Sequence, residues 1–555
     1  MKRTLAVCAT TTLLIAGLAL PAGAADFGPT PDFVKDIMAG GADSAPSQSA
    51  AIGPRVVFGA TDATHGQELW VSDGTGARTR LLKDINAGSG SSVPLSFTAF
   101  KGKVYFSAID ASHGAELWVT DGTSGGTRLF KDINGGGLSS SPAELTVAGD
   151  TLFFRAATAA AGAELWKSGG TAASTVLVED IAPGSADSSP LQLTVMGSKV
   201  VFAATQTVGN VEPWISNGSA ASTYTLGNVN PTAGAGSYPG GFAVLGSTVM
   251  FSAAGTTSNF ELWRSKGLPG DATIVKDINP GAGSSPDELT AYHGVILFRA
   301  TRAGVGAELW ASDGTPGGTQ LIRDIYDGPN NGSPSSLTRF NGAVYFSATT
   351  AASGKELWVT RGGLSSTRQV KDVYPGVTSG GADQFKVTGP LLTFASDSPS
   401  RGVEVWQTTG TRSGTTLAKD IFEGPTNSSP TPLTSVSNTL FFVAADATHG
   451  RELWSYTTRP SATKAYPKSE YSKKSASKRR IHVTVRVRAT GTTPTGKVTL
   501  KKGSTAIGSG TLHSGKTTIR ITIKLGRGTT KIRAHYDGSV RARVSTSSTF
   551  KIKVT

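Results

Sequence analysis

The nine tryptophans of the chain constrain its fold most, because each closes a copy of one tripeptide, Glu-Leu-Trp. Successive tryptophans are separated by 48, 48, 48, 49, 47, 48, 48 and 48 residues. Leucine is replaced by Pro213 and Val405 in two copies, but the glutamate is present in all nine. Such a period, with several short apolar runs per copy, is typical of a repeat fold built as a ring or a linear array. The pairs are Glu68 and Trp70, Glu116 and Trp118, Glu164 and Trp166, Glu212 and Trp214, Glu261 and Trp263, Glu308 and Trp310, Glu356 and Trp358, Glu404 and Trp406, and Glu452 and Trp454.

One copy of the repeat shows the elements that we expect. Short β-favouring runs cover residues 104–108, 116–119, 127–133 and 144–147. Turns rich in Gly, Asp, Asn, Ser and Pro join them, and no run has helical periodicity. Four short strands per copy predict an all-β propeller of four-stranded blades in residues 26–458.

The two ends of the repeat array predict a closed ring. A second marker, Lys-Asp-Ile, first occurs at residues 35–37, before any tripeptide, and none follows the last tripeptide at residues 452–454. Each end therefore holds the fragment that the other lacks. We predict that the N-terminal strand, near residues 32–37, completes the ninth blade and covers two sheet edges.

The repeated glutamate and tryptophan are predicted to be structural. Strand alternation places Glu116 and Trp118 on one face and Leu117 and Val119 on the other. We expect the indoles to fill the space between blades, and each carboxylate to accept hydrogen bonds from backbone N–H groups of the Asp-Gly-Thr turn. A catalytic group is needed once, whereas this glutamate occurs nine times.

Metal binding is the less favoured interpretation of two other patterns. Asp-Ile-Asn runs such as residues 84–86 suggest calcium, but Asn228 lacks the charge and Ala182 or Tyr326 replaces the third residue elsewhere. Turn formation explains these residues as well. No cofactor is therefore predicted, with calcium as the alternative. Three histidines precede the glycine before a tripeptide, and we expect separate surface turns rather than a shared metal: His65, His113 and His449.

The repeat unit resembles a known family. Residues 308–319, Glu-Leu-Trp-Ala-Ser-Asp-Gly-Thr-Pro-Gly-Gly-Thr, followed by Arg-Asp-Ile at 323–325, are similar to the ELWxxDGT repeat of secreted bacterial proteins. Residues 277–286 resemble the segment that follows it in that family. The resemblance covers about residues 30–458 and implies an extracellular β-propeller-like array with no established catalytic residues. The copy at residues 212–217 departs most from the pattern.

Residues 1–25 have the features of a secretory signal peptide. A basic start, an apolar run at residues 13–20 and Ala-Gly-Ala at 22–24 are in the expected order. The only cysteine, Cys8, lies within this segment, so the mature protein would have no disulfide, thiolate metal site or cysteine nucleophile. No later run reaches the ~18 apolar residues of a membrane span. We therefore expect a secreted, extracellular protein, possessing no membrane span and able to associate non-covalently with the cell envelope.

The composition changes after residue 458. Residues 459–480, rich in Lys, Ser, Ala and Pro, are predicted to be a basic linker. Residues 481–555 regain β alternation and predict a small Ig-like β-sandwich. Residues 494–498 and 532–538 within it resemble the bacterial Ig-like domain of surface proteins, in which the cysteines of antibody domains are absent.

Charge divides the chain at the same boundary. Residues 459–555 contain 23 Lys and Arg against two acids, a net charge of +21, and the remaining 30 basic and 37 acidic residues give −7. For an exported protein this predicts anionic partners such as wall polymers, acidic polysaccharide or phospholipid headgroups rather than nucleic acid. A basic surface kept for solubility is the alternative. The candidate residues for anionic-polymer binding are Lys473, Lys474, Lys478, Arg479, Arg480, Arg486 and Arg488.

These features predict a non-enzymatic binding, scaffold or adhesion protein of the bacterial cell surface. The propeller would be a platform for ligands or proteins, the basic module would associate with the envelope, and the protein would be a monomer. The alternative is a carbohydrate-active hydrolase or lyase whose site consists of a few non-repeated residues. A single deep pocket with converging carboxylates would indicate the enzyme, and the non-repeated residues to examine are Arg155, Arg299, Arg302 and Arg339.

Overall fold

The computed structural model describes residues 30–256, 259–458, 461–468, 479–489, 496–512, 518–525, 528–536, 545–546 and 550–554. The predicted signal peptide and Cys8 lie outside these residues. The described chain is all β, with single 3-10 turns at Gly76–Arg78, Ala220–Ser222 and Leu364–Ser366. Within the same ranges, no helix has the length and apolar character needed to cross a membrane.

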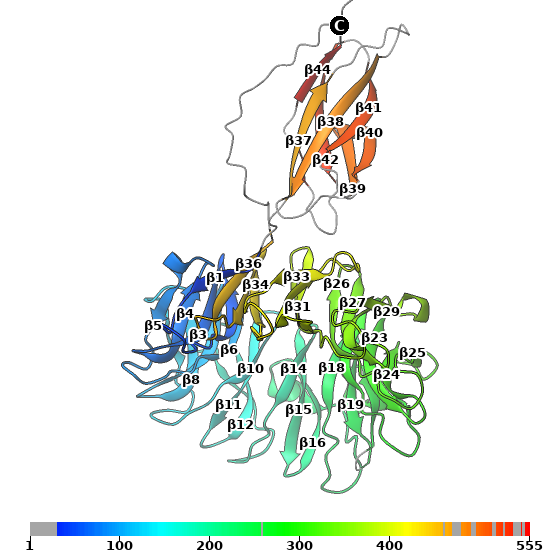
Figure 1. The fold of residues 1–555 in the computed structure, drawn as a ribbon. Helices are drawn as coiled ribbons and strands as arrows, with labels where there is room; N and C mark the ends of the chain where they lie inside the picture. Colours follow the sequence, from blue (N-terminus) through cyan, green and yellow to red (C-terminus); the bar gives the residue numbers. More distant parts are fainter. Residues whose placement is uncertain are drawn as a thin grey trace, which may run out of the picture.

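Residues 32–457 form nine four-stranded antiparallel sheets (Figure 1). Eight sheets consist of four consecutive strands each. The first four contain β2 (Ser47–Ile52), β3 (Arg55–Asp62), β4 (Gly66–Ser72) and β5 (Arg80–Lys83); β6 (Leu95–Phe100), β7 (Lys103–Asp110), β8 (Gly114–Thr120) and β9 (Arg128–Lys131); β10 (Ala143–Ala148), β11 (Thr151–Thr158), β12 (Gly162–Ser168) and β13 (Val176–Glu179); and β14 (Leu191–Met196), β15 (Lys199–Thr207), β16 (Asn210–Ser216) and β17 (Thr223–Thr225). The next four contain β18 (Gly240–Leu245), β19 (Thr248–Ala254), β20 (Phe260–Ser265) and β21 (Thr273–Lys276); β22 (Asp287–Tyr292), β23 (Val295–Arg302), β24 (Gly306–Ser312) and β25 (Gln320–Arg323); β26 (Ser335–Phe340), β27 (Ala343–Thr350), β28 (Gly354–Thr360) and β29 (Arg368–Lys371); and β30 (Asp383–Thr388), β31 (Leu391–Ser398), β32 (Gly402–Thr408) and β33 (Thr416–Lys419).

The apolar runs of the repeat form the second and third strands, which are buried on both faces. In the second sheet, every residue from 104 to 108 is buried. Leu117 packs with Phe154 of the third sheet, whereas Trp118 packs with Leu69 of the first. Each blade therefore buries one face against the preceding blade and the other against the next, as a propeller requires.

The ninth sheet is completed by the N-terminal strand. It contains β34 (Thr431–Val436), β35 (Thr439–Ala444), β36 (Glu452–Thr457) and, beside β36, β1 (Asp32–Lys35). The innermost strands of successive sheets contact one another around the whole ring, including β34 with β2. A core cluster joins Val34 and Phe441 of the ninth sheet to Phe58 and Trp70 of the first. The predicted nine-repeat propeller, with its last blade completed by the N-terminal strand, is confirmed.

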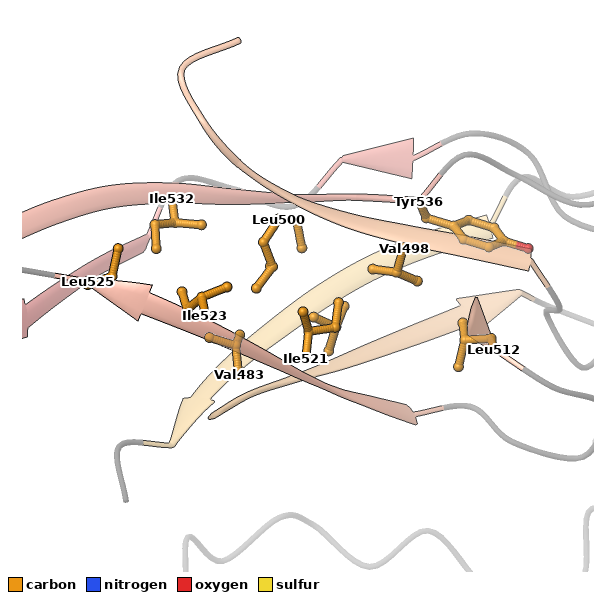
Figure 2. Close-up of a cluster of buried hydrophobic side chains, with 11 residues drawn as sticks. Val483, Val498, Leu500, Leu512, Ile521, Ile523, Leu525, Ile532 and Tyr536 are labelled. Atoms are coloured by element: carbon orange, nitrogen blue, oxygen red, sulfur yellow. The ribbon is translucent and has the colours of Figure 1, made fainter. Parts of the chain in front are cut away.

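The C-terminal module contains two sheets. One has the order β37 (Ser461–Lys468), β38 (Arg479–Ala489) and β41 (Thr518–Leu525). The other has the order β40 (Thr505–Leu512), β39 (Gly496–Lys502), β42 (Gly528–Tyr536) and β43 (Ser545–Thr546), and β44 (Phe550–Val554) also pairs with β42. Their apolar side chains meet in one core that includes Val483, Leu500, Ile521 and Tyr536 (Figure 2). The predicted β-sandwich is therefore confirmed.

The predicted linker 459–480 is wrong for part of its length. Residues Ser461–Lys468 form β37, which pairs with β38 from Ser461 opposite Ala489 to Lys468 opposite His482. β37 lies at the edge of its sheet, where Lys and Pro are common because they discourage pairing with another chain. Its composition thus resembled that of a solvated linker.

Candidate functional site

The nine repeated glutamates are buried, each at most 5% exposed. Glu116 accepts hydrogen bonds from the backbone N–H groups of Ile133 (2.8 Å), Asn134 (3.3 Å) and Ser140 (2.8 Å), and from the Ser140 hydroxyl (2.6 Å). These donors lie in the loop between β9 and β10, so the prediction that the Asp-Gly-Thr turn supplies them is wrong. The glutamate lies near the start of the third strand, whereas the Asp-Gly-Thr turn follows the end of that strand.

In the ninth sheet, the same arrangement joins the two ends of the ring. Glu452 accepts hydrogen bonds from the N–H groups of Ile37 (3.0 Å), Met38 (3.2 Å) and Ser44 (3.1 Å), and from the Ser44 hydroxyl (2.6 Å). These donors precede Glu452 in the chain by 408 to 415 residues. The repeated carboxylate therefore fixes each inter-blade loop and, once, ring closure.

Burial raises the pKa of all nine carboxyls, and the N–H and hydroxyl donors oppose this effect. For Glu308 and Glu356 the pKa rises to about 7. In these two copies Gly332 and Gly380 replace the serine, so the hydroxyl donor is lost. The serine present in the other copies is Ser44, Ser92, Ser140, Ser188, Ser237, Ser284 or Ser428.

Eight of the nine tryptophans are buried, and Trp263 is partly buried. The basic residue of the Lys-Asp-Ile marker extends over the indole of the next blade in three copies. The distances from cation to ring centroid are 5.7 Å for Arg323 and Trp358, 5.2 Å for Lys371 and Trp406, and 4.8 Å for Lys419 and Trp454. Cation–π attraction adds to apolar packing between these blades.

The three repeated histidines belong to separate hairpin turns. The Nδ1 atoms of His65, His113 and His449 each form a hydrogen bond with an aspartate three residues earlier, and this bond raises the pKa of each histidine. The turns lie in the first, second and ninth sheets. Within the described ranges, no group of three or more His, Cys, Asp or Glu residues could hold a metal ion.

The four non-repeated arginines of the enzyme hypothesis lie on three different sheets. Arg155 is in β11 of the third sheet, Arg299 and Arg302 are in β23 of the sixth, and Arg339 is in β26 of the seventh. Arg299 forms an ion pair with Asp287 on the neighbouring strand.

A cavity of about 510 Å³ lies in the first sheet, at the end where the Asp-Gly-Thr turn is found. Three of its lining residues are arginines, and Asp73 is its one carboxylate. The lining consists of Pro54, Arg55, Val71, Asp73, Ala77, Arg78 and Arg80. The sequence pattern alone did not identify this site. A comparison of the copies could have done so, because three arginines coincide only in the first copy. At the positions of Arg55, Arg78 and Arg80, the second copy has Lys103, Gly126 and Arg128.

The C-terminal module carries a basic face on the pair β39 and β42. Val498 and Ile532 point into the core, so alternate residues point outward. Lys497, Lys531 and Arg533 are exposed, and Lys501 is partly exposed. Two of these cations are directly opposite in the register, Lys501 and Arg533. We call the four residues the basic face.

The predicted polymer-binding residues are only partly placed. Lys473, Lys474 and Lys478 lie outside the described residues. Arg479, Arg480, Arg486 and Arg488 belong to β38, for which the backbone pairing at these positions is described but the side chains are not.

Comparison with known proteins identifies the class of the C-terminal module. Residues 470–555 match the family of bacterial Ig-like domains (group 3). This match does not extend to the repeats, and no curated protein sequence matches the chain.

Several solved structures resemble the chain distantly. A prolyl endopeptidase structure has 12% identity and a TM-score of 0.38, over 80% of this chain and 54% of that one. The β-propeller domain of the Trilobed protease from Pyrococcus furiosus has 10% identity and a TM-score of 0.32, over 59% and 97%. Sqt1 from Saccharomyces cerevisiae has 10% identity and a TM-score of 0.34, over 78% and 99%. The chain thus spans about half of the prolyl endopeptidase, and likenesses this distant carry no functional argument.

Proposed function

We propose that this chain is a secreted, non-enzymatic binding or scaffold protein of the bacterial cell surface. In this proposal the propeller is a rigid platform for ligands or proteins. The Ig-like module holds the platform at the envelope by attraction to anionic polymers, such as acidic polysaccharide.

The charge of the C-terminal module carries the proposal. Residues 459–555 have a net charge of +21, and the basic face displays Lys497, Lys501, Lys531 and Arg533 on one side of a sheet. Cations spaced along neighbouring strands can contact several anionic groups of one polymer together. Attraction of this kind depends on salt, because the Debye length is only ~8 Å near 0.15 M ionic strength.

The test uses the full-length protein on immobilised polygalacturonate. We expect strong retention at low salt and release between about 50 and 300 mM salt. The variant carrying Lys497→Glu, Lys501→Glu and Lys531→Glu should be released at clearly lower salt. These residues point away from the core, so the thermal unfolding temperature should be unchanged.

A charge-matched variant separates the basic face from overall charge. Lys266→Glu, Arg302→Glu and Arg361→Glu change three exposed propeller residues by the same total charge. This variant should be retained like the wild type. Salt-insensitive retention, or equal loss in both variants, would contradict the proposed role of the module.

A further inference from the structure

We propose that the cavity of the first sheet binds an oxyanion group, such as a carboxylate or sulfate, carried on a sugar-sized ligand. This site lies on the propeller and is independent of the basic face. It gives the platform one specific ligand site, which goes beyond the proposed function.

Two of the three guanidinium groups of the cavity have partners among the described residues. Arg55 donates from Nη1 to the carbonyl oxygen of Gly122 in the second sheet, at 2.9 Å. Arg78 pairs with Asp73, with 3.2 Å between Nη1 and Oδ2. Arg80, opposite Val71 in the register, is exposed and makes no side-chain hydrogen bond or ion pair within the described part of the chain. Because each guanidinium has five N–H donors, most donors of the cavity have no acceptor among the residues that the structure describes.

The lining has more positive than negative charge. Asp73 is its single carboxylate, and it already accepts hydrogen bonds from Thr75 and Arg78. Despite desolvation, these bonds lower the pKa of Asp73, so it is ionised at neutral pH. Three arginines against one aspartate leave a positive lining, and guanidinium groups bind oxyanions with paired N–H donors.

The arrangement occurs once in the ring. At the positions of Arg55, Arg78 and Arg80, the seventh copy has Ala343, Ser366 and Arg368. The structural features of this propeller are repeated, as the nine buried glutamates show. The combination of three arginines is therefore not part of the repeated framework that builds the ring.

The dimensions and the remaining lining favour an anion attached to a larger body. A volume of about 510 Å³ lies within the range of small-molecule sites and far exceeds the space for one ion. Pro54 and Ala77, which are both exposed, contribute apolar surface beside the arginines. A uronic acid residue, with its carboxylate toward the arginines and its ring against this surface, has the required chemistry.

The test is calorimetric titration of the full-length protein with monomeric glucuronate, inorganic sulfate and neutral glucose. We expect glucuronate to bind with one site per chain and glucose to show no binding. Arg80→Gln and Arg55→Gln should each weaken glucuronate binding about tenfold, as expected for loss of one charged hydrogen-bonding group. Binding of sulfate as well would support recognition of the oxyanion itself.

Two controls decide between this site and other sources of binding. Arg368→Gln removes the arginine at the position of Arg80 in the seventh blade and should leave glucuronate affinity unchanged. The basic-face variant Lys497→Glu, Lys501→Glu and Lys531→Glu should also bind glucuronate normally, so failure of envelope binding and failure of this site are distinguishable. Absence of glucuronate binding, or equal affinity in Arg80→Gln, would overturn the proposal.

Discussion

The substitution Gly332→Ser should stabilise the ring, and its effect should depend on pH. Gly332 occupies the position at which seven copies have a serine that donates its hydroxyl to the buried glutamate. In the second blade that bond, from Ser140 to Glu116, is 2.6 Å long. Glu308 has only backbone donors, and burial raises its pKa to about 7.

The raised pKa has a defined effect on stability. An unfolded glutamate titrates near 4.3. The stabilisation from a carboxyl with a raised folded pKa is fully present below about 4.3 and is lost as the pH rises through about 7. One pKa unit corresponds to about 1.4 kcal/mol, so Glu308 destabilises the ring at pH 8 by at most ~4 kcal/mol, less after local relaxation. Glu356 should act in the same way.

The new hydroxyl should recover part of this loss. A hydrogen bond to a charged group contributes about 1.5–3 kcal/mol. A Cβ on Gly332 would lie 2.5 Å from Oε2 of Glu308, so the carboxylate must shift to admit the serine. We therefore expect a gain of about 1 kcal/mol in the free energy of unfolding at pH 8, and little gain at pH 5, where the carboxyl is protonated.

Denaturant unfolding of full-length variants at pH 5 and pH 8 measures this effect. Gly332→Ala is the matched control, because it restricts the unfolded backbone in the same way without adding a hydroxyl. The converse variant Ser140→Gly should lose stability at pH 8, because Glu116 loses its hydroxyl donor. If Gly332→Ser and Gly332→Ala have equal stability at both pH values, the serine hydroxyl does not stabilise the charged carboxylate of Glu308.

Two further predictions concern ring closure and the tryptophans. Deleting residues 26–38 removes β1 and two hydrogen-bond donors to Glu452. The unfolding temperature should therefore fall markedly, and aggregation should rise because a sheet edge is exposed. An unchanged melting curve would contradict closure of the ring by this strand. Trp310→Ala should lower the free energy of unfolding by about 3–5 kcal/mol, because Trp310 is 2% exposed. Acrylamide should quench the wild-type fluorescence weakly, and strong quenching of most indoles would contradict their burial between blades.

The repeat pattern predicted the elements of the propeller and its closure, but not its internal contacts. Matching fragments at residues 35–37 and 452–454 were enough to predict that the chain ends meet, because a sheet edge is stabilised by a partner strand. The donors to Glu116 could not be deduced in this way. They lie 17, 18 and 24 residues further along the chain, and which loop approaches the carboxylate depends on the packing of neighbouring blades.

The sequence by itself determined the all-β class, the nine repeats and the change of domain after residue 458, since periodicity and composition are local properties. Only the tertiary structure decided which strands share a sheet, because residues 144–147, expected to end the second copy, lie in β10, the innermost strand of the third sheet. It also decided that residues 461–468 pair as an edge strand and that Arg55, Arg78 and Arg80 line one cavity. Strand pairing and cavities join residues that are distant in the chain, and a local pattern does not specify them.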